Sequence, residues 1–268
     1  MICQAVHLGV GDATLHPICF TNTPELKLSP RRAVIVCPGG GYGMLSDREA
    51  EPIAAQFLAA GFATFILRYG VGAAAADYLP LKQVAAAVRY VRTHAEDYCV
   101  DENYVFTCGF SAGGHLAASA GVLWQHPCLG AECADGMARP TGMILAYPVI
   151  TAGEFAHRGS ILRLCGKEQP TEAEMAAFSL EKQVDATTPP AFLWHTFSDA
   201  TVPVQNSLLL AEAMTAAGVP FELHIFPEGV HGLSLCNEIT ACGKENKMNA
   251  HCEIWMELAI RWAKGLEV

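Results

Sequence analysis

A serine between two glycines is the first residue of this chain whose surroundings could support catalysis. Ser111 is at the centre of the run Gly-Phe-Ser-Ala-Gly at positions 109–113. This G-x-S-x-G pattern is typical of a sharp turn from a strand into a helix, where glycines avoid the clashes of a Cβ atom and the serine hydroxyl is exposed. The start of the following helix favours negative charge on a nearby oxygen. We predict that Ser111 is a nucleophile; the competing interpretation is a glycine-rich turn with a structural serine.

Three consecutive glycines form a second candidate element. Gly39, Gly40 and Gly41 follow the apolar run at positions 33–37. Such a loop lets the backbone approach a ligand and turns N–H groups toward it, which suits an oxyanion hole completed by the N–H after the nucleophile. We predict Gly40, Gly41 and Ala112 as its donors, and leave open which of the two glycines donates. A plain structural turn is one alternative; a phosphate-binding loop is another, but the Gly-Lys-Ser/Thr that it requires does not follow.

A serine hydroxyl is a weak nucleophile without a base, and ten histidines are available to serve as one. His231 lies in a Gly-Val-His-Gly loop after the apolar run at positions 221–226, late in the chain, where the order Ser…Asp/Glu…His places the base. His115 is expected on the helix after the serine, buried beneath the turn. His195 falls inside a predicted strand and is expected to have a core role, and His251 lies on the last predicted helix. We therefore predict His231 as the base.

The third member of such a site must be a carboxylate that orients the imidazole. Asp199 directly follows the apolar run at positions 191–196 and precedes a predicted helix. This position puts it at the sheet edge where the serine and the histidine emerge, which is where open α/β sheets bind ligands. Its alternative role is that of a helix cap. Asp185 and Glu181 precede the strand and belong to the opposite edge, so Asp199 is the predicted partner.

Six continuous apolar runs alternate with helical stretches and define the elements that must position these residues. Their lack of polar alternation predicts strands buried on both faces, as in a parallel sheet. Two alternating segments at positions 2–10 and 13–20 precede them and predict an antiparallel hairpin. The predicted strands are 33–37, 63–67, 104–108, 142–147, 191–196 and 221–226, and the predicted helices are 47–61, 77–98, 113–124, 204–217 and 248–264. The predicted fold class is α/β, an α/β-hydrolase fold with a mostly parallel doubly wound sheet and an N-terminal antiparallel edge hairpin.

No repeat or linker divides the chain, so residues 1–268 are predicted to form a single α/β-hydrolase domain. In the first helix, Asp47 is the expected cap, with Glu49 and Glu51 in the first turn. The stretch at positions 151–189 lacks a clear strand and mixes short helical pieces with glycine and proline. Long loops of this kind are often functional lids. We therefore treat residues 151–189 as a candidate cap over the site.

Composition narrows the range of partners. Apolar residues make up 51% of the chain and charged residues 16%, and 17 Lys and Arg stand against 27 Asp and Glu for a net charge of −10. Without any basic run, nucleic-acid and acidic-membrane binding are not expected, and an acidic surface suits a small neutral ester better than a polyanion. No apolar run reaches the roughly 18 residues of a membrane span. A homo-oligomer is compatible with all of these features.

The cysteines and the N-terminal residues give indications about the cellular compartment and about metal binding. Residues 1–10 carry no basic segment and no small-residue cleavage site, so no signal peptide is predicted. The 11 cysteines include no C-x-x-C pair, which favours a reduced, cytoplasmic setting. Cys236, Cys242, His251 and Cys252 match no standard zinc spacing. We predict neither a metal nor an organic cofactor.

Four motifs taken together resemble a bacterial α/β-hydrolase group. Its members are labelled acetylxylan-esterase-like or xylanase-associated esterases and are related to the hormone-sensitive-lipase type. The resemblance spans most of the chain, from about residue 31 to residue 231 and on to the last helix. The motifs are Pro-Gly-Gly-Gly-Tyr-Gly at 38–43, Arg-Glu-Ala-Glu-Pro at 48–52, Gly-Phe-Ser-Ala-Gly-Gly-His-Leu at 109–116 and Trp-His-Thr-Phe-Ser-Asp at 194–199. The chain departs from many lipases and esterases by having Pro-Gly-Gly-Gly where they have His-Gly-Gly-Gly.

The resemblance implies a triad of Ser111, Asp199 and His231, no cofactor, and short acyl esters, notably of acetylated sugars, as substrates. The predicted reaction is acyl transfer through an acyl-enzyme. An arylformamidase-like amidase shares the same motifs and stays open as an alternative. A prolyl-oligopeptidase-like peptidase is disfavoured because only about thirty residues precede the first core strand. A non-catalytic binding module is the alternative from another class, since fold alone does not determine function.

Overall fold

The computed structural model describes residues 1–130, 133 and 135–267, and its centre is a mostly parallel β-sheet. The eight strands lie in the order β1-β2-β4-β3-β5-β6-β7-β8. They are β1 (Val6–His7), β2 (Thr14–Ile18), β3 (Arg31–Cys37), β4 (Ala63–Arg68), β5 (Val100–Phe110), β6 (Gly142–Ala146), β7 (Ala191–Thr196) and β8 (Phe221–Phe226). Pairing is antiparallel at β1–β2 and β2–β4 and parallel from β4 to β8. The predicted fold class, an α/β-hydrolase sheet with an N-terminal antiparallel hairpin, is confirmed.

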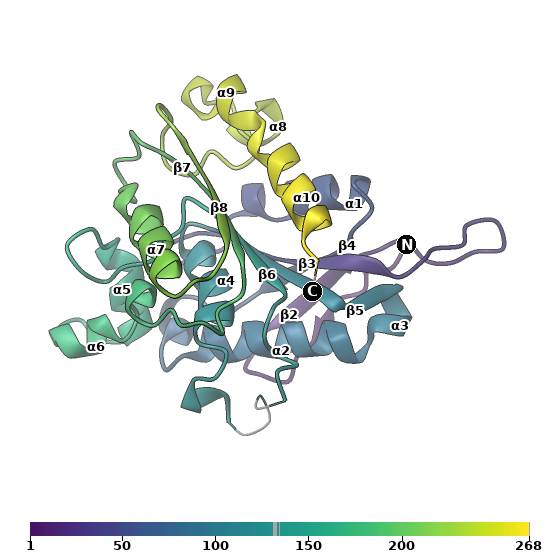
Figure 1. Ribbon diagram of the computed structural model, residues 1–268, viewed down its shortest axis with the longest axis horizontal. Helices are drawn as coiled ribbons and strands as arrows, with labels where there is room; N and C mark the ends of the chain where they lie inside the picture. The colour runs from purple at the N-terminus through teal and green to yellow at the C-terminus, as the bar shows by residue number, and fades with distance from the viewer. Residues whose placement is uncertain (131–132, 134, 268) are drawn as a thin grey trace.

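Helices cover both faces of the sheet, as Figure 1 shows. They are α1 (Glu51–Ala59), α2 (Leu79–Thr93), α3 (Ala95–Tyr98), α4 (Ala112–Val122), α5 (Arg158–Cys165), α6 (Glu172–Ala176), α7 (Gln205–Ala216), α8 (Glu238–Ala241), α9 (Ala250–Glu253) and α10 (Trp255–Gly265). Alternate strand residues enter two separate apolar cores. One core lies between the sheet and α2, α4 and α7, and the other between the sheet and α1 and α10.

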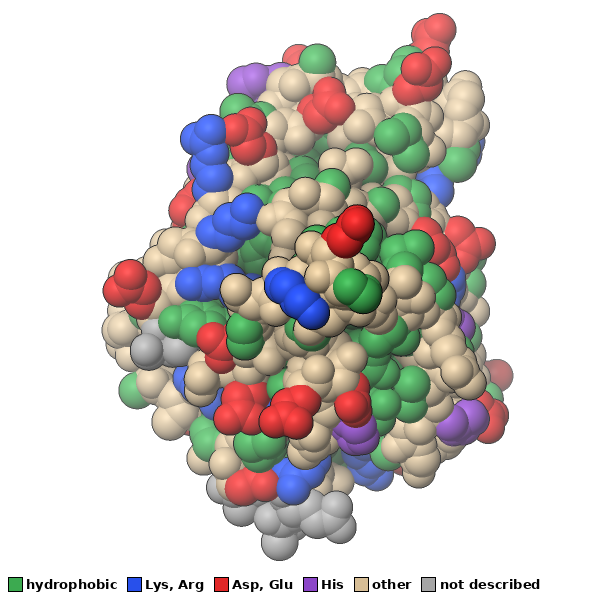
Figure 2. Space-filling view, turned by 90° about the vertical axis from the view of Figure 1, so that its right-hand side faces the viewer, with side chains coloured by type: hydrophobic (Ala, Val, Ile, Leu, Met, Phe, Trp, Pro, Cys, Tyr) green, Lys and Arg blue, Asp and Glu red, His purple; other side chains and the backbone are tan. Residues whose placement is uncertain are grey.

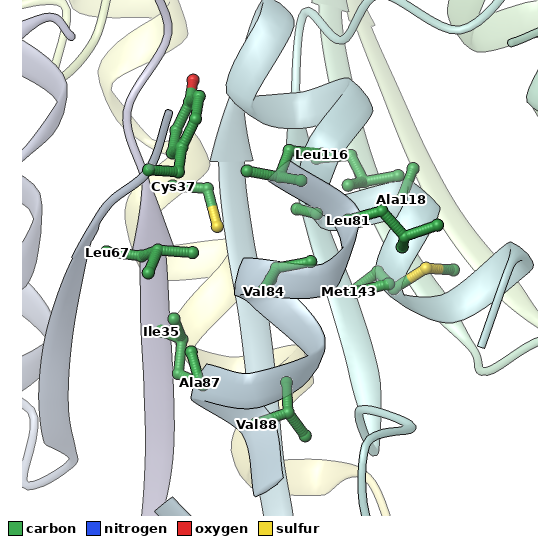
Figure 3. Close-up of a cluster of buried hydrophobic side chains, with 14 of the residues drawn as sticks. Ile35, Cys37, Leu67, Leu81, Val84, Ala87, Val88, Leu116, Ala118 and Met143 are labelled. Carbon is green, nitrogen blue, oxygen red and sulfur yellow. The ribbon is translucent and has the colours of Figure 1, made fainter. Parts of the chain in front are cut away.

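The first core shows why this arrangement is stable. In Figure 3 the apolar side of α2, with Leu81, Val84 and Val88, faces side chains of the sheet such as Ile35 and Leu67. All five side chains are buried. Burial of apolar area at about 25 cal/mol per Å² is the main force that holds helices on a sheet. The inner strands therefore meet apolar side chains on both faces, as their unbroken apolar runs predicted, whereas the edge strand β8 is mostly half-buried.

Some boundaries differ from the sequence prediction for physical reasons. Strand β5 begins at Val100, earlier than predicted, and its first part exposes polar residues such as Glu102, so apolar continuity could not reveal it. The predicted helix cap Asp47 is wrong. Residues Asp47–Glu49 form a 3-10 helix, and α1 begins only at Glu51 with Ala50 in the N-cap position. Asp47 instead lies at the surface and pairs with Arg68 at 3.1 Å.

The segment at positions 151–189 contains no strand and carries α5 and α6, in agreement with the mixture of short helical pieces expected there. Helix α6 begins with a capping box formed by Thr171 and Glu174. The segment is fastened to the body of the molecule at Leu180, whose N–H donates to the Ile150 carbonyl at 3.1 Å. Motion of this segment as a lid stays a prediction.

Positively and negatively charged side chains are mixed on the face of the molecule that Figure 2 shows. Figure 2 shows one face of the molecule, on which acidic, basic and apolar side chains are interspersed. Within the described residues, no helix has both the length and the apolar character needed to cross a bilayer.

Candidate active site

Ser111 occupies a strained turn between β5 and α4. Its φ of 55° and ψ of −118° lie outside the regions that non-glycine residues commonly adopt. The two flanking glycines are required by space: a Cβ on Gly109 would lie 2.0 Å from the Gly113 carbonyl oxygen, and one on Gly113 would lie 2.1 Å from the Cys37 carbonyl oxygen. The strand–turn–helix context predicted from the G-x-S-x-G pattern is therefore present. Backbone strain of this kind is commonly associated with function.

The structure brings Ser111, His231 and Asp199 into one chain of hydrogen bonds. His231 Nε2 lies 2.8 Å from Ser111 Oγ, and His231 Nδ1 lies 2.6 Å from Asp199 Oδ2. Ser111 and Asp199 are buried, with 7% and 5% of their surface exposed. The tautomer that fits donates Nδ1–H to the carboxylate and leaves Nε2 to accept the serine proton. The three residues predicted from the sequence thus lie in the geometry that general-base activation of a hydroxyl requires.

Asp199 is held as a carboxylate by its surroundings. Burial on its own would raise the pKa of Asp199, but the neighbouring imidazoles of His195 and His231 and the Val202 N–H outweigh it. The pKa therefore lies well below its ordinary value. Asp199 Oδ1 accepts the N–H groups of Thr201 at 2.9 Å and Val202 at 3.0 Å. The side chain therefore also caps the turn that follows it, which is close to the capping role considered as the alternative.

The order of the parallel strands explains why these three residues meet. Ser111 follows β5, and Asp199 and His231 lie beyond the ends of β7 and β8. The carboxyl ends of parallel strands share one sheet edge, where α/β proteins bind ligands. The loop before His231 is anchored at Gly229, whose carbonyl accepts bonds from Thr196 Oγ1 at 3.0 Å and Ser198 Oγ at 3.1 Å.

The predicted oxyanion donors lie beside this relay. Gly40 and Gly41 line the same cavity as Ser111 and His231, and the cavity has a volume of about 630 Å³. The backbone N–H groups of Gly40, Gly41 and Ala112 donate no hydrogen bond to any other residue that the structure describes. The assignment of all three as oxyanion donors, and the choice between the two glycines, stay predictions.

Glu49 is a site component that the sequence analysis missed, since it was taken for a first-turn helix residue. Its side chain is buried, Oε2 accepts the Gly39 N–H at 3.0 Å, and Oε1 accepts the Tyr147 hydroxyl at 2.8 Å. Tyr147 in turn accepts the Ser234 N–H at 2.9 Å, and its ring meets the His231 ring edge-on. Glu49 thus connects the glycine loop with the segment that carries the histidine. The Arg-Glu-Ala-Glu-Pro motif was the available signal.

Two cations, Arg48 and Lys247, donate to backbone carbonyls of the histidine loop. Arg48 Nη2 donates to the Gly232 carbonyl at 2.9 Å, and its Nη1 donates to the Thr240 carbonyl at 2.9 Å. Lys247 Nζ donates to the carbonyls of His231 and Gly232. Arg48 opens the Arg-Glu-Ala-Glu-Pro motif, whereas no local sequence pattern pointed to Lys247.

His115 and His195 are buried, as the sequence analysis expected. His115 is buried under the turn and bonds to Tyr42 Oη at 2.9 Å and the Phe178 carbonyl at 3.0 Å. His195 is buried and bonds to Ser207 Oγ at 2.8 Å and the Val202 carbonyl at 2.9 Å. His195 also lies 3.6 Å from Asp199 Oδ2, which extends its core role to the support of that carboxylate. Among the described residues, no three His, Cys, Asp or Glu side chains gather in a way that could hold a metal ion.

The sheet order and the strained serine turn define the α/β-hydrolase class of protein. Within that class, the chain belongs to the BD-FAE family, whose model matches residues 22–214. It is 41% identical over 216 residues to endo-1,4-beta-xylanase B of Butyrivibrio fibrisolvens. The matched region covers 78% of this chain and 33% of that protein. It is 32% identical over 226 residues to an acetylxylan esterase of Xylanibacter ruminicola, with 82% of this chain and 44% of that protein covered. The chain therefore spans less than half the length of these two curated relatives.

Solved structures match over nearly their whole length. An acetyl ester-xyloside bifunctional hydrolase from Caldicellulosiruptor lactoaceticus shares 32% identity at a TM-score of 0.81, with 97% of this chain and 95% of that chain covered. A carboxylesterase from Lactobacillus plantarum shares 29% identity at a TM-score of 0.84, with 98% and 96% covered. Several of these similar proteins are named esterases or carboxylesterases.

Proposed function

We propose that this protein is a serine carboxylesterase that hydrolyses short acyl esters, acetyl esters above all, of small carbohydrates such as xylo-oligosaccharides. The observation that carries the proposal is the relay from Ser111 Oγ to His231 Nε2 at 2.8 Å and from His231 Nδ1 to Asp199 Oδ2 at 2.6 Å. The acetylxylan esterase and the acetyl ester-xyloside hydrolase among the similar proteins support the acetyl and carbohydrate parts of the proposal.

The proposed reaction has two halves. His231 Nε2 takes the proton of Ser111 Oγ while that oxygen attacks the ester carbonyl carbon. The N–H groups of Ala112 and of Gly40 or Gly41 stabilise the oxyanion, which collapses with release of the alcohol as His231 returns the proton to the alcohol oxygen. Water then attacks the acyl-serine, His231 takes the water proton and returns it to Ser111, and the acid leaves.

Hydrolysis of 4-nitrophenyl acetate by the native chain and by Ser111→Ala tests the central claim. We expect the variant to lose at least a factor of about 10³ in kcat, because the covalent path is removed and only binding and oxyanion stabilisation remain. Circular dichroism checks that the variant is folded. Activity that survives in a folded Ser111→Ala variant would contradict the proposal.

A substrate comparison tests the acetyl-carbohydrate assignment against the amidase alternative. Acetate release from acetylated xylo-oligosaccharides is measured beside hydrolysis of 4-nitrophenyl acetate and of N-formylkynurenine. We expect a higher kcat/KM for the acetylated oligosaccharides than for the formamide. A strong preference for the formamide would favour the arylformamidase-like function, and the same Ser111 mechanism would still apply.

A further inference from the structure

More cations than carboxylates line the cavity at Ser111. Arg48, Arg163 and Lys247 all line it. None of the three lies within 4.0 Å of a carboxylate oxygen belonging to the described part of the chain. The one acidic residue of the lining is Glu49, which together with Asp199 offsets part of the charge of Lys247. Positive charge therefore predominates in the cavity.

The partners of these cations are neutral carbonyl groups. Arg163 reaches in from α5, and its Nη1 donates to the carbonyls of Gly41 and Gly159, both at 3.1 Å. Lys247 approaches from the other side, on the carbonyls of the histidine loop. A carbonyl orients such a head group but leaves its net charge in place. The remaining Arg163 donors, Nη2 and Nε, lie beside Gly43 and make no hydrogen bond to a described residue, and together they form the planar fork that suits a carboxylate.

The local charge is opposite to that of the whole chain, whose net charge is −10. A cavity with the opposite sign to its protein raises the local concentration of a complementary ligand and lowers that of others. The neutral ester expected from composition alone does not explain this arrangement. The cations also hold loops, so loop support is the competing explanation that an experiment must exclude.

We propose that the cavity selects esters whose alcohol half carries a carboxylate, with Arg163 and Lys247 as specificity-determining residues. The inference rests on the proposed esterase function, in which the acyl half is a small acetyl group. The carboxylate must then belong to the alcohol half, which occupies the rest of the cavity of about 630 Å³. An anion placed there meets the cationic groups of Arg163 and Lys247 beside the reacting ester.

The test compares two acetyl esters of matched size, 3-acetoxybenzoate and 3-acetoxybenzamide, by release of the phenol. The readout is the ratio of their kcat/KM values in the native chain, Arg163→Gln and Lys247→Gln. Glutamine can still donate to a carbonyl, so these variants remove charge with little loss of loop support. The matched control is Arg158→Gln, an exposed residue on the same helix α5 that does not line the cavity.

We expect the ratio to favour the benzoate in the native chain and to fall about three- to tenfold in each of the two variants, while Arg158→Gln leaves it unchanged. Raising the ionic strength from about 0.02 M to about 0.3 M should lower kcat/KM for the benzoate more than for the benzamide, because salt screens only the charged substrate.

An equal loss for both esters in the Arg163 and Lys247 variants would show that these residues only support the loops, and would overturn the inference while the esterase function stands. A fall of the ratio in Arg158→Gln as large as in the other variants would overturn it as well, because the selectivity would then come from general surface charge. Absence of hydrolysis of both esters by the native chain would overturn the proposed function and the inference together.

Discussion

Asp199 shows how one side chain combines a structural and a proposed catalytic role. One carboxylate oxygen accepts two backbone N–H groups of its own turn, and the other accepts the Nδ1–H of His231. The first set fixes the direction of the carboxylate, and the second selects the imidazole tautomer that can accept a proton at Nε2. Buried His195 lies close to the same oxygen and limits the room for any other arrangement.

Asp199→Asn is expected to lower kcat by a factor of about 10³ to 10⁴ while leaving the fold intact. The amide keeps the turn bonds of one oxygen, but its NH₂ group facing Nδ1 favours the tautomer in which Nε2 carries the proton and cannot act as a base. Steady-state kinetics on 4-nitrophenyl acetate measure the effect, with thermal unfolding as the control for folding. A kcat within tenfold of the native value would exclude the proposed role of Asp199.

At the scale of elements, the site depends on close contact between β5, α4 and the loop after β3. The first turn of α4 lies directly against that loop, since a Cβ on Gly113 would meet the carbonyl oxygens of Cys37 at 2.1 Å and Pro38 at 2.4 Å. Backbone atoms cannot give way as a flexible side chain can. The nucleophile turn and the glycine loop are therefore positioned by the same contact.

Gly113→Ala is expected to abolish activity or prevent folding, because relief of this clash must separate α4 from the glycine loop. We expect a loss of at least about 3 kcal/mol in the free energy of unfolding, at the upper end of the usual effect of single substitutions. The matched control is Gly265→Ala at the end of α10, where nothing lies within 4 Å of an added Cβ. Denaturant unfolding of both variants measures the difference, and similar stabilities would contradict the explanation.

The loops around the site are joined by Glu49, which leads to another prediction at this scale. Glu49→Ala leaves the Gly39 N–H and the Tyr147 hydroxyl without their buried acceptor, at an expected cost of about 3 kcal/mol in unfolding free energy together with a lower kcat. Glu51→Gln is the control, because Glu51 lies at the surface and pairs only with Arg68 at 2.7 Å. It should change stability by no more than about 0.5 kcal/mol. Equal effects of the two substitutions on unfolding would refute this role of Glu49.

At the scale of the whole molecule, His115 joins parts of the chain that are distant in sequence. From α4 it bonds to Tyr42 of the glycine loop and to the carbonyl of Phe178 in the candidate cap. Complete burial lowers the pKa of His115 to about 4, with the bond to Phe178 as a smaller opposing effect. The neutral ring is therefore part of the folded state, whereas in the unfolded chain it titrates near pH 6.5.

The free energy of unfolding should therefore decrease as the pH falls, because His115 binds a proton more readily in the unfolded chain than in the folded one. Between pH 6.5 and pH 4 the unfolded chain binds a proton that folded His115 does not, so its contribution is present above pH 6.5 and is lost at about 1.4 kcal/mol per pH unit below it. His115→Leu should be less stable than the native chain at pH 7.5 by about 2 kcal/mol, with a difference that shrinks toward pH 5. Urea unfolding at both values measures this, and a difference that is constant with pH would contradict it.

Much of the site could be predicted from sequence because its chemistry depends on local patterns and chain order. The glycines that the turn at Ser111 requires lie within five consecutive residues, so the sequence reveals the turn. Asp199 and His231 each follow an apolar strand, and parallel strands end at one edge whatever their order in the sheet. The placement of these residues follows from the topology, while their catalytic roles await the experiments above.

Contacts between loops were decided only by the tertiary structure. Glu49 resembled a first-turn helix residue, and nothing around Lys247 or Arg163 suggested a place at the cavity. Their positions depend on how β3, α5 and the segment after β8 fold onto one another, and no periodic pattern records this for irregular segments. Amino-acid order by itself therefore determined the α/β sheet and the residues gathered at its edge. The charge of the cavity was decided by packing, because cations far apart in sequence converge there while the overall composition is acidic.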